Sequence, residues 1–212
     1  SLKRVATRRQ NLIVCFIGAA MSAPMLAFAG FWGVAWLMQT HGFTRPEAGA
    51  TTSLLLLGWA VGSPFGGWLS DRLGRRKAVL QGGCLVTLAA LLPLLYIETL
   101  PEWLLLACFF VTGAGAGPMV VGFAMARFYN PTEETGAALG LVNGAVTATG
   151  AVFQPFIGLL LDLGWDGATD QGARLYSPAT FGWAFSCLIV FLALALLASL
   201  LLREPRPATK AA

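Results

Sequence analysis

Charged side chains are scarce in this sequence. Lys, Arg, Asp and Glu together make up 11% of its 212 residues, whereas hydrophobic residues make up 57%. These fractions lie far from the average of soluble globular domains. The net charge of +4 does not point to nucleic acid, because the basic residues lie at the ends of apolar runs and form no stripe with interleaved aromatics. The composition therefore excludes an ordinary soluble domain and argues against nucleic-acid binding.

Residues that bind metals or carry out catalysis are also few. The four cysteines each lie inside an apolar run, none belongs to a C-x-x-C pair, and His41 is the only histidine. This argues against zinc and redox sites. The sequence contains no H-E-x-x-H motif, nucleophile elbow or P-loop. We therefore expect no enzyme activity, no catalytic residue, no metal site and no cofactor.

Long apolar runs dominate what is present. A membrane-spanning helix needs about 20 mostly apolar residues, and six runs meet that length. They cover residues 12–38, 48–69, 78–97, 103–126, 136–161 and 179–202. The runs are too long, and alternate too little, to be transmembrane strands. The predicted fold class is an all-α membrane protein with six transmembrane helices.

The basic residues predict how these helices are oriented. Twelve of the fourteen lie on one side of the six predicted spans, and only Arg45 and Arg174 lie on the other. Because positive charge collects in cytoplasmic loops, we expect both termini to be cytoplasmic and the protein to be multi-pass in the cell inner membrane. Residues 1–10 are predicted to be a cytoplasmic basic linker, 11–203 a six-helix bundle and 204–212 a cytoplasmic tail.

The loop between the second and third runs carries the most specific motif, G-x-x-x-D-R-x-G-R-R. Its defined positions are Gly67, Asp71, Arg72, Gly74, Arg75 and Arg76. Asp71 is predicted at a helix C-terminus, where the helix dipole disfavours an acid, so it needs a basic partner or a neighbouring helix N-terminus. Motif and spans together resemble the major facilitator superfamily of secondary transporters. A simple positive-inside stop signal is the alternative interpretation.

The resemblance implies half of a transporter. Major facilitators contain two six-helix halves, each built from two inverted three-helix repeats, with the substrate between the halves. The basic start resembles the linker between halves, and residues 150–162 resemble the eleventh helix of bacterial members. We therefore expect the C-terminal half, helices seven to twelve. A start at Ser1 also favours a piece of a longer chain.

A second loop on the same side is predicted to begin the fifth helix. Asn130 is a candidate N-cap, Pro131 suits the first helical position, and Glu133 completes a capping box. By the resemblance, this helix start meets the other half of the transporter. We group it with the motif as a gating charge cluster. Its members are Gly67, Asp71, Arg72, Gly74, Arg75, Arg76, Arg127 and Glu133. An ordinary capped helix is the alternative.

Polar residues inside the runs are candidates for a substrate cavity, because an amide or hydroxyl in hydrocarbon is costly. At 100° per residue, Asn143, Thr147 and Gln154 share one face of the fifth run. Trp32, Trp36 and Gln39 share a face of the first. Helix–helix hydrogen bonding, core packing or an interfacial aromatic belt would explain the same residues without a ligand.

The function expected from the resemblance is half of a secondary active transporter, a symporter, for a small polar or amphipathic solute. Its partners would be the substrate, the lipid bilayer and another six-helix half, in the same chain or in a second copy. No acid lies mid-span, so a proton-coupling residue is expected in the other half. A homodimeric transporter or channel and a non-transporting membrane scaffold remain alternatives.

Overall fold

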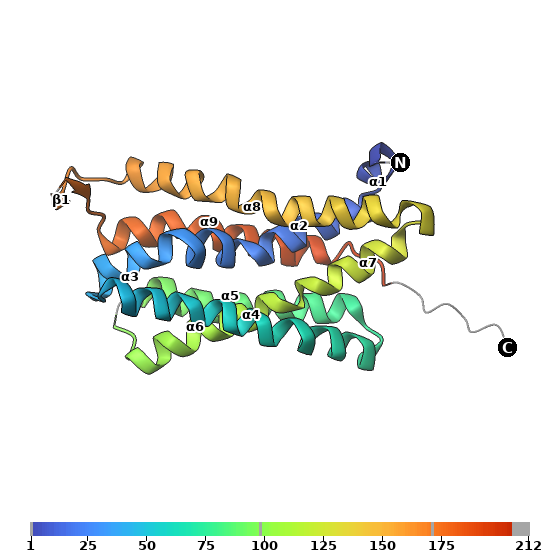
Figure 1. Ribbon diagram of the computed structural model, residues 1–212, viewed down its shortest axis with the longest axis horizontal. Coiled ribbons are helices and arrows are strands. Elements are labelled where there is room, and N and C mark those ends of the chain that lie inside the picture. Colours follow the sequence, from blue (N-terminus) through green and yellow to red (C-terminus); the bar gives the residue numbers. More distant parts are fainter. Residues whose placement is uncertain (1, 98, 171, 205–212) are drawn as a thin grey trace.

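The computed structural model describes residues 2–97, 99–170 and 172–204, and it is helical apart from one short hairpin. Figure 1 shows an elongated bundle whose long helices run along a common axis. The first span is α2 (Arg9–Ala23), η1 (Pro24–Trp32) and α3 (Gly33–His41), preceded by α1 (Leu2–Thr7). The others are α4 (Arg45–Leu73); α5 (Arg76–Tyr96); α6 (Glu102–Ala116) with η2 (Gly117–Val120) and α7 (Val121–Tyr129); η3 (Thr132–Glu134) with α8 (Thr135–Leu163); and α9 (Pro178–Ser199).

Five of the described segments are long and apolar enough to cross a membrane. They correspond to the first, third, fourth, fifth and sixth runs of the sequence. The second run forms α4, a helix of 29 residues, but α4 is not among the five. Its glycine, serine and threonine residues lower its hydropathy, and several of them are buried against neighbouring helices. The six predicted runs therefore fall on helical segments, but only five of these segments have the length and hydropathy of a membrane span.

Local sequence signals set several of the helix boundaries. The Glu47 carboxylate accepts hydrogen bonds from the Thr44 backbone N–H (2.8 Å) and hydroxyl (2.7 Å) and so begins α4. Gly74, with φ of 62°, ends the same helix in the left-handed conformation that glycine adopts without strain. The Ser177 hydroxyl accepts from the Thr180 N–H (3.1 Å) and begins α9.

The helices pack in a repeating pattern. The second span, α4, packs most extensively on the fourth span, and the fifth span, α8, packs on the first. The third span, α5, contacts α6, and the sixth, α9, contacts α2 in the same way. Exchanging the first three spans for the last three therefore reproduces the main helix contacts.

Glycines bring α4 and α6 into backbone contact. Gly58 and Gly62 of α4 face Gly113 of α6 and Gly117 of η2 across this seam. A Cβ atom at Gly62 would overlap the backbone of Ala114, and one at Gly113 would overlap the carbonyl group of Leu55. Only glycine allows helices to approach so closely.

Aromatic rings fill the core beside this seam. Phe28 of η1 stacks on Phe109 of α6 with ring centroids 5.5 Å apart, and it meets Phe185 of α9 edge-on at 5.0 Å. All three rings are fully buried. The first, fourth and sixth spans are thus joined at the centre of the bundle.

Candidate functional site

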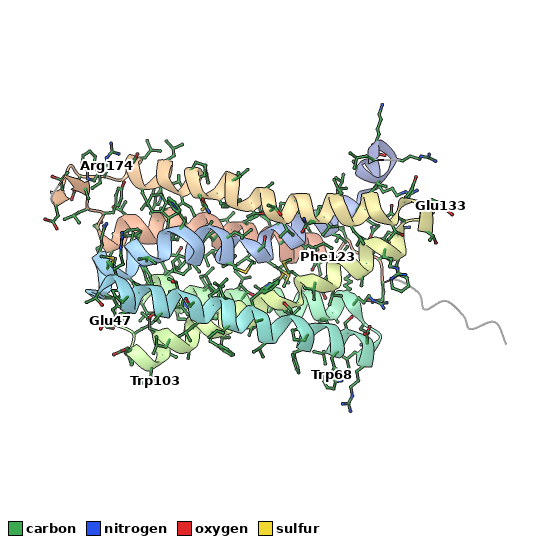
Figure 2. The ribbon with its side chains drawn as sticks, in the orientation of Figure 1. Glu47, Trp68, Trp103, Phe123, Glu133 and Arg174 are labelled. Atoms are coloured by element: carbon green, nitrogen blue, oxygen red, sulfur yellow. The ribbon has the colours of Figure 1, made fainter. Side chains whose placement is uncertain are left out.

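Polar residues gather at the two ends of the bundle. The basic end contains α1, the turn between α4 and α5, the turn before η3 and the end of α9. The hairpin end contains β1 (Thr169–Asp170) and β2 (Ala173–Arg174). Figure 2 shows Glu47, Trp103 and Arg174 towards the hairpin end, and Trp68 and Glu133 towards the basic end. Trp68 and Trp103 are both exposed, as tryptophans at membrane boundaries are.

The G-x-x-x-D-R-x-G-R-R motif forms a loose charge pair at the basic end. Asp71 lies in the last turn of α4, and its carboxylate lies 3.8 Å from the guanidinium of Arg76. The Asp71 side chain is 79% exposed, so this pair contributes little to stability by itself. Arg76 also lies over the Phe128 ring at 4.3 Å, and Arg72 lies over Trp68 at 5.2 Å. One arginine of the motif therefore pairs with Asp71, while another is held by an aromatic ring.

Arg127 lies close to the same group. Together with Arg76 it lines a shallow cleft of about 470 Å³. The remaining lining residues are Phe123, Ala124, Phe128 and Leu139. Arg76 thus contacts Asp71 and shares a cleft with Arg127, but Arg127 has no carboxylate partner among the described residues.

The capping box expected at Asn130 and Glu133 is absent, which corrects that prediction. The Glu133 side chain is exposed, whereas Glu134 is buried and pairs with Arg8 at 2.8 Å and Arg4 at 3.4 Å. Asn130 does not cap the next helix, because its amide is used elsewhere. The acid that carries the contact is one residue later than the sequence pattern suggested.

Asn130 instead pairs with Asn11 of the first span. The two side-chain amides donate to each other at 2.8 and 3.0 Å, and Arg8 donates to the Asn130 oxygen at 2.5 Å. Asn11 is 1% exposed and Asn130 is 8% exposed. This polar lock joins the start of the first span to the end of the fourth. Sequence reasoning missed Asn11, whose only signal was an amide beside the start of an apolar run.

The predicted polar face of α8 divides into two parts. Asn143 and Thr147 are exposed, and the Thr147 hydroxyl donates to the Asn143 carbonyl at 2.9 Å. On the same stretch, Gly140 and Gly144 have no atom near the position of a Cβ. A small polar surface is therefore open in the middle of a membrane-length helix.

Gln154, by contrast, is joined to the first span. Its amide donates to the Leu26 carbonyl at 3.0 Å, and the Trp32 ring N–H donates to the Gln154 carbonyl at 2.9 Å. Gly158 leaves room for the Trp32 ring, which would lie 3.0 Å from a Cβ there. Leu26 and Trp32 belong to η1, a π-helical segment that starts at Pro24. The sequence-predicted residues Trp32 and Gln154 are thus brought together, but as a helix–helix contact.

Trp36 and Gln39 do not join them on one open surface. Trp36 is 4% exposed and packs against Phe28 with ring centroids 5.5 Å apart. Gln39 is half-buried and holds the loop before α9, because its side chain accepts from the Tyr176 N–H at 2.8 Å. Both side chains are therefore used in contacts within the bundle. The spacing of residues along the first span could not predict these contacts.

Ionic and aromatic contacts fasten the hairpin loop. Arg174 pairs with Asp162 at 2.5 Å and lies over the Trp165 ring at 4.5 Å. The Tyr176 hydroxyl donates to Asp162 at 2.7 Å. Burial raises the pKa of Tyr176, and its bond to the Asp162 carboxylate raises that pKa further. Within the described residues, no group of His, Cys, Asp and Glu is arranged to hold a metal ion.

Comparison with known proteins decides the family. The sequence profile described as Major Facilitator Superfamily matches residues 11–212. The chain belongs to the major facilitator superfamily. It is therefore a multi-pass membrane protein from a family of transporters, not of enzymes.

Other members of the superfamily match parts of the chain. The uncharacterized MFS-type transporter YfiU of Bacillus subtilis is 38% identical over 116 residues, 55% of this chain and 22% of that protein. The probable nitrate/nitrite transporter NarK2 of Mycobacterium tuberculosis is 30% identical over 74% of this chain and 39% of its own length. The multidrug resistance protein MdtL of Escherichia coli is 32% identical over 76% and 37%.

A solved structure shows the same major facilitator fold. A partially occluded, inward-open conformation of the xylose transporter XylE from E. coli superimposes with a TM-score of 0.73 at 15% identity. The match covers 93% of this chain and 48% of XylE. The chain thus has a major facilitator half fold, and it spans less than half the length of these relatives.

Proposed function

We propose that this chain forms one six-helix half of a secondary active transporter that moves a small polar or amphipathic solute by alternating access. Family membership and the half-length match support the proposal. The repeating helix contacts are those expected of two inverted three-helix repeats. The basic start and the character of residues 150–162 favour the C-terminal half, helices seven to twelve. The partner is a second six-helix half, in the same polypeptide or in another copy.

The orientation is proposed from charge. The basic end contains most of the arginine and lysine residues, so we infer that it faces the cytoplasm of the inner membrane. A cysteine placed at Arg75 would then react with impermeant reagents only from the inside, and one at Asp166 only from the outside. The reverse pattern would contradict the orientation.

The open polar face of α8 carries the proposal. An unpaired amide facing hydrocarbon costs roughly 2–7 kcal/mol, and Asn143 is exposed in the middle of a 29-residue helix. Water, a substrate or the partner half must therefore cover it. We propose that Asn143 and Thr147 line this half's share of the substrate cavity. Gln154 and Trp32 join the same helix to the first span, whereas Trp36 and Gln39 contact other parts of the bundle and do not form this wall.

The coupling mechanism is proposed to depend on the partner half. Glu134 is buried within the described residues, but it lies at the basic end and is already paired with two arginines. The middle of the bundle therefore offers no free acid in the described residues. If the transporter is a symporter, the titrating residue belongs to the other half.

The cavity assignment predicts different outcomes for the two amides. Asn143→Ala is expected to weaken substrate binding in the transporter while leaving its melting temperature unchanged, because the side chain is exposed and makes no hydrogen bond to another described residue. Gln154→Ala should instead lower the melting temperature, since it loses the bond to Leu26. Binding assays and thermal unfolding in detergent separate the two effects. Unchanged affinity in Asn143→Ala would contradict the cavity assignment.

The charge cluster predicts a transport defect. Asp71→Asn is expected to slow transport in proteoliposomes by up to about fivefold, which corresponds to the upper limit for an exposed ion pair, because one access state loses its pair with Arg76. Membrane insertion should be unaffected, since Asp71 is exposed. Asp166→Asn, at the hairpin end, is a matched control and should transport normally. Wild-type rates in Asp71→Asn would remove the gating role.

A further inference from the structure

A second cavity lies at the basic end, away from the polar face of α8. It has a volume of about 570 Å³ and lies between the start of α2, the end of α7 and the chain that follows α9. Its lining residues are Arg8, Arg9, Gln10, Tyr129, Leu201 and Arg203. Three of the six are arginines and none is an acid.

The framework of this pocket is fixed by hydrogen bonds. The Gln10 side chain donates to the Leu201 carbonyl at 3.1 Å and accepts from the Arg203 backbone N–H at 2.8 Å. The Tyr129 hydroxyl donates to the Arg203 carbonyl. The backbone beyond α9 is thus tied to both α2 and α7, which holds the three arginines around one space.

The neighbouring acids leave this pocket positive. Glu134 is engaged by Arg8 and Arg4, and the Glu204 carboxylate accepts from the backbone N–H groups of Arg76 and Lys77 at 2.6 and 3.1 Å. Within residues 2–97, 99–170 and 172–204, no carboxylate pairs with Arg9 or Arg203. The first turn of α2 also contains no acid, so the positive end of its dipole adds to the charge.

An apolar surface continues from the pocket along the bundle. Leu201 lines the pocket itself and is 53% exposed, and Leu197 and Leu200 on the same side of the chain are also exposed. Leu12 of α2 is exposed one turn beyond Arg9. A ligand that fits both surfaces has an anionic head and a hydrocarbon tail.

We propose that this pocket binds the phosphate headgroup of an anionic phospholipid, with Arg9 and Arg203 as the principal ligands and the exposed leucines contacting an acyl chain. Basic pockets between transmembrane helices bind such headgroups. Arg8 contributes less because Glu134 and Asn130 already hold its guanidinium. The bound lipid bridges the start of the first span and the end of the sixth.

Native mass spectrometry of the purified protein in detergent tests this site. Titration with phosphatidylglycerol should show one tightly held lipid, whereas phosphatidylcholine, which has no net charge, should bind far more weakly. Arg9→Gln and Arg203→Gln should each weaken phosphatidylglycerol binding about fivefold, and the double variant about 30-fold, from the value of one basic residue near a lipid surface. Both side chains are exposed, so thermal unfolding should confirm that the variants are folded.

Arg45→Gln provides the matched control, because it removes one arginine at the hairpin end and should leave phosphatidylglycerol binding unchanged. Inorganic phosphate and glycerol 1-phosphate form a further arm. If either soluble anion binds as tightly as the lipid, the pocket is a site for soluble phosphate and the lipid assignment is wrong. Equal binding of both lipids, or undiminished binding by the double variant, would also overturn it.

Discussion

Gly62→Ala is expected to lower the free energy of unfolding by about 3 kcal/mol, the upper part of the range for overpacked cores. The added methyl group would overlap the backbone of Ala114, which cannot rotate away as a side chain can. The helices α4 and α6 would have to separate along their whole seam. Gly113→Ala should have a similar effect, because it meets the Leu55 carbonyl from the other side. Unfolding in mixed micelles, monitored by tryptophan fluorescence, measures the loss.

Gly49→Ala is the matched control on the same helix. No atom lies near the position of its Cβ, so the substitution should be neutral or stabilising by up to about 1 kcal/mol, the difference in helix propensity between alanine and glycine. If Gly62→Ala and Gly49→Ala were equally well tolerated, the close approach of α4 and α6 would not exist in the membrane.

Asn130→Leu is expected to destabilise the bundle by about 1–3 kcal/mol, because the buried side-chain amide of Asn11 loses both bonds to Asn130 and keeps only the one to the Val5 carbonyl. Asn11→Leu should cost a similar amount for the reciprocal reason. The double variant should recover much of the loss, since two leucines of similar size can pack where two amides were paired. A double-mutant cycle of unfolding free energies measures this coupling.

The cycle shows whether Asn11 and Asn130 stabilise the bundle through their mutual hydrogen bonds or independently of each other. Additive losses in the double variant would show that Asn11 and Asn130 do not depend on each other. Arg8 retains Glu134 as its partner in every variant, so the cycle does not expose a second buried charge.

Much of the fold was predictable because hydrophobic runs are long and their signal is strong. The six predicted runs fall on six helical segments, and α4 ends two residues after Asp71, which was predicted at a helix C-terminus. The weakest of these predictions concerned α4. Its glycine, serine and threonine residues lower its mean hydropathy, but the glycines allow its backbone to approach that of α6 closely.

The candidate site was less predictable, because its contacts join distant parts of the chain. Asn130 looked like a helix cap, but its partner Asn11 lies 119 positions away. Helical arithmetic grouped Gln154 with Asn143, yet only Gln154 meets the π-helical segment of the first span. The spacing of residues along a helix predicts which of them share a face. It does not predict which residues of other helices they contact, because that depends on how the helices cross.

The glycine seam has a mechanical consequence. Where two helices meet backbone to backbone, no side-chain rotamers lie between them that could rearrange to accommodate a new angle. Any tilt of α4 against α6 would open an empty gap or drive carbonyl groups into each other. These two helices are therefore expected to move together as one rigid body. Bending during a transport cycle would then concentrate in the first span, where the π-helical turn between Pro24 and Trp32 already departs from regular helical geometry.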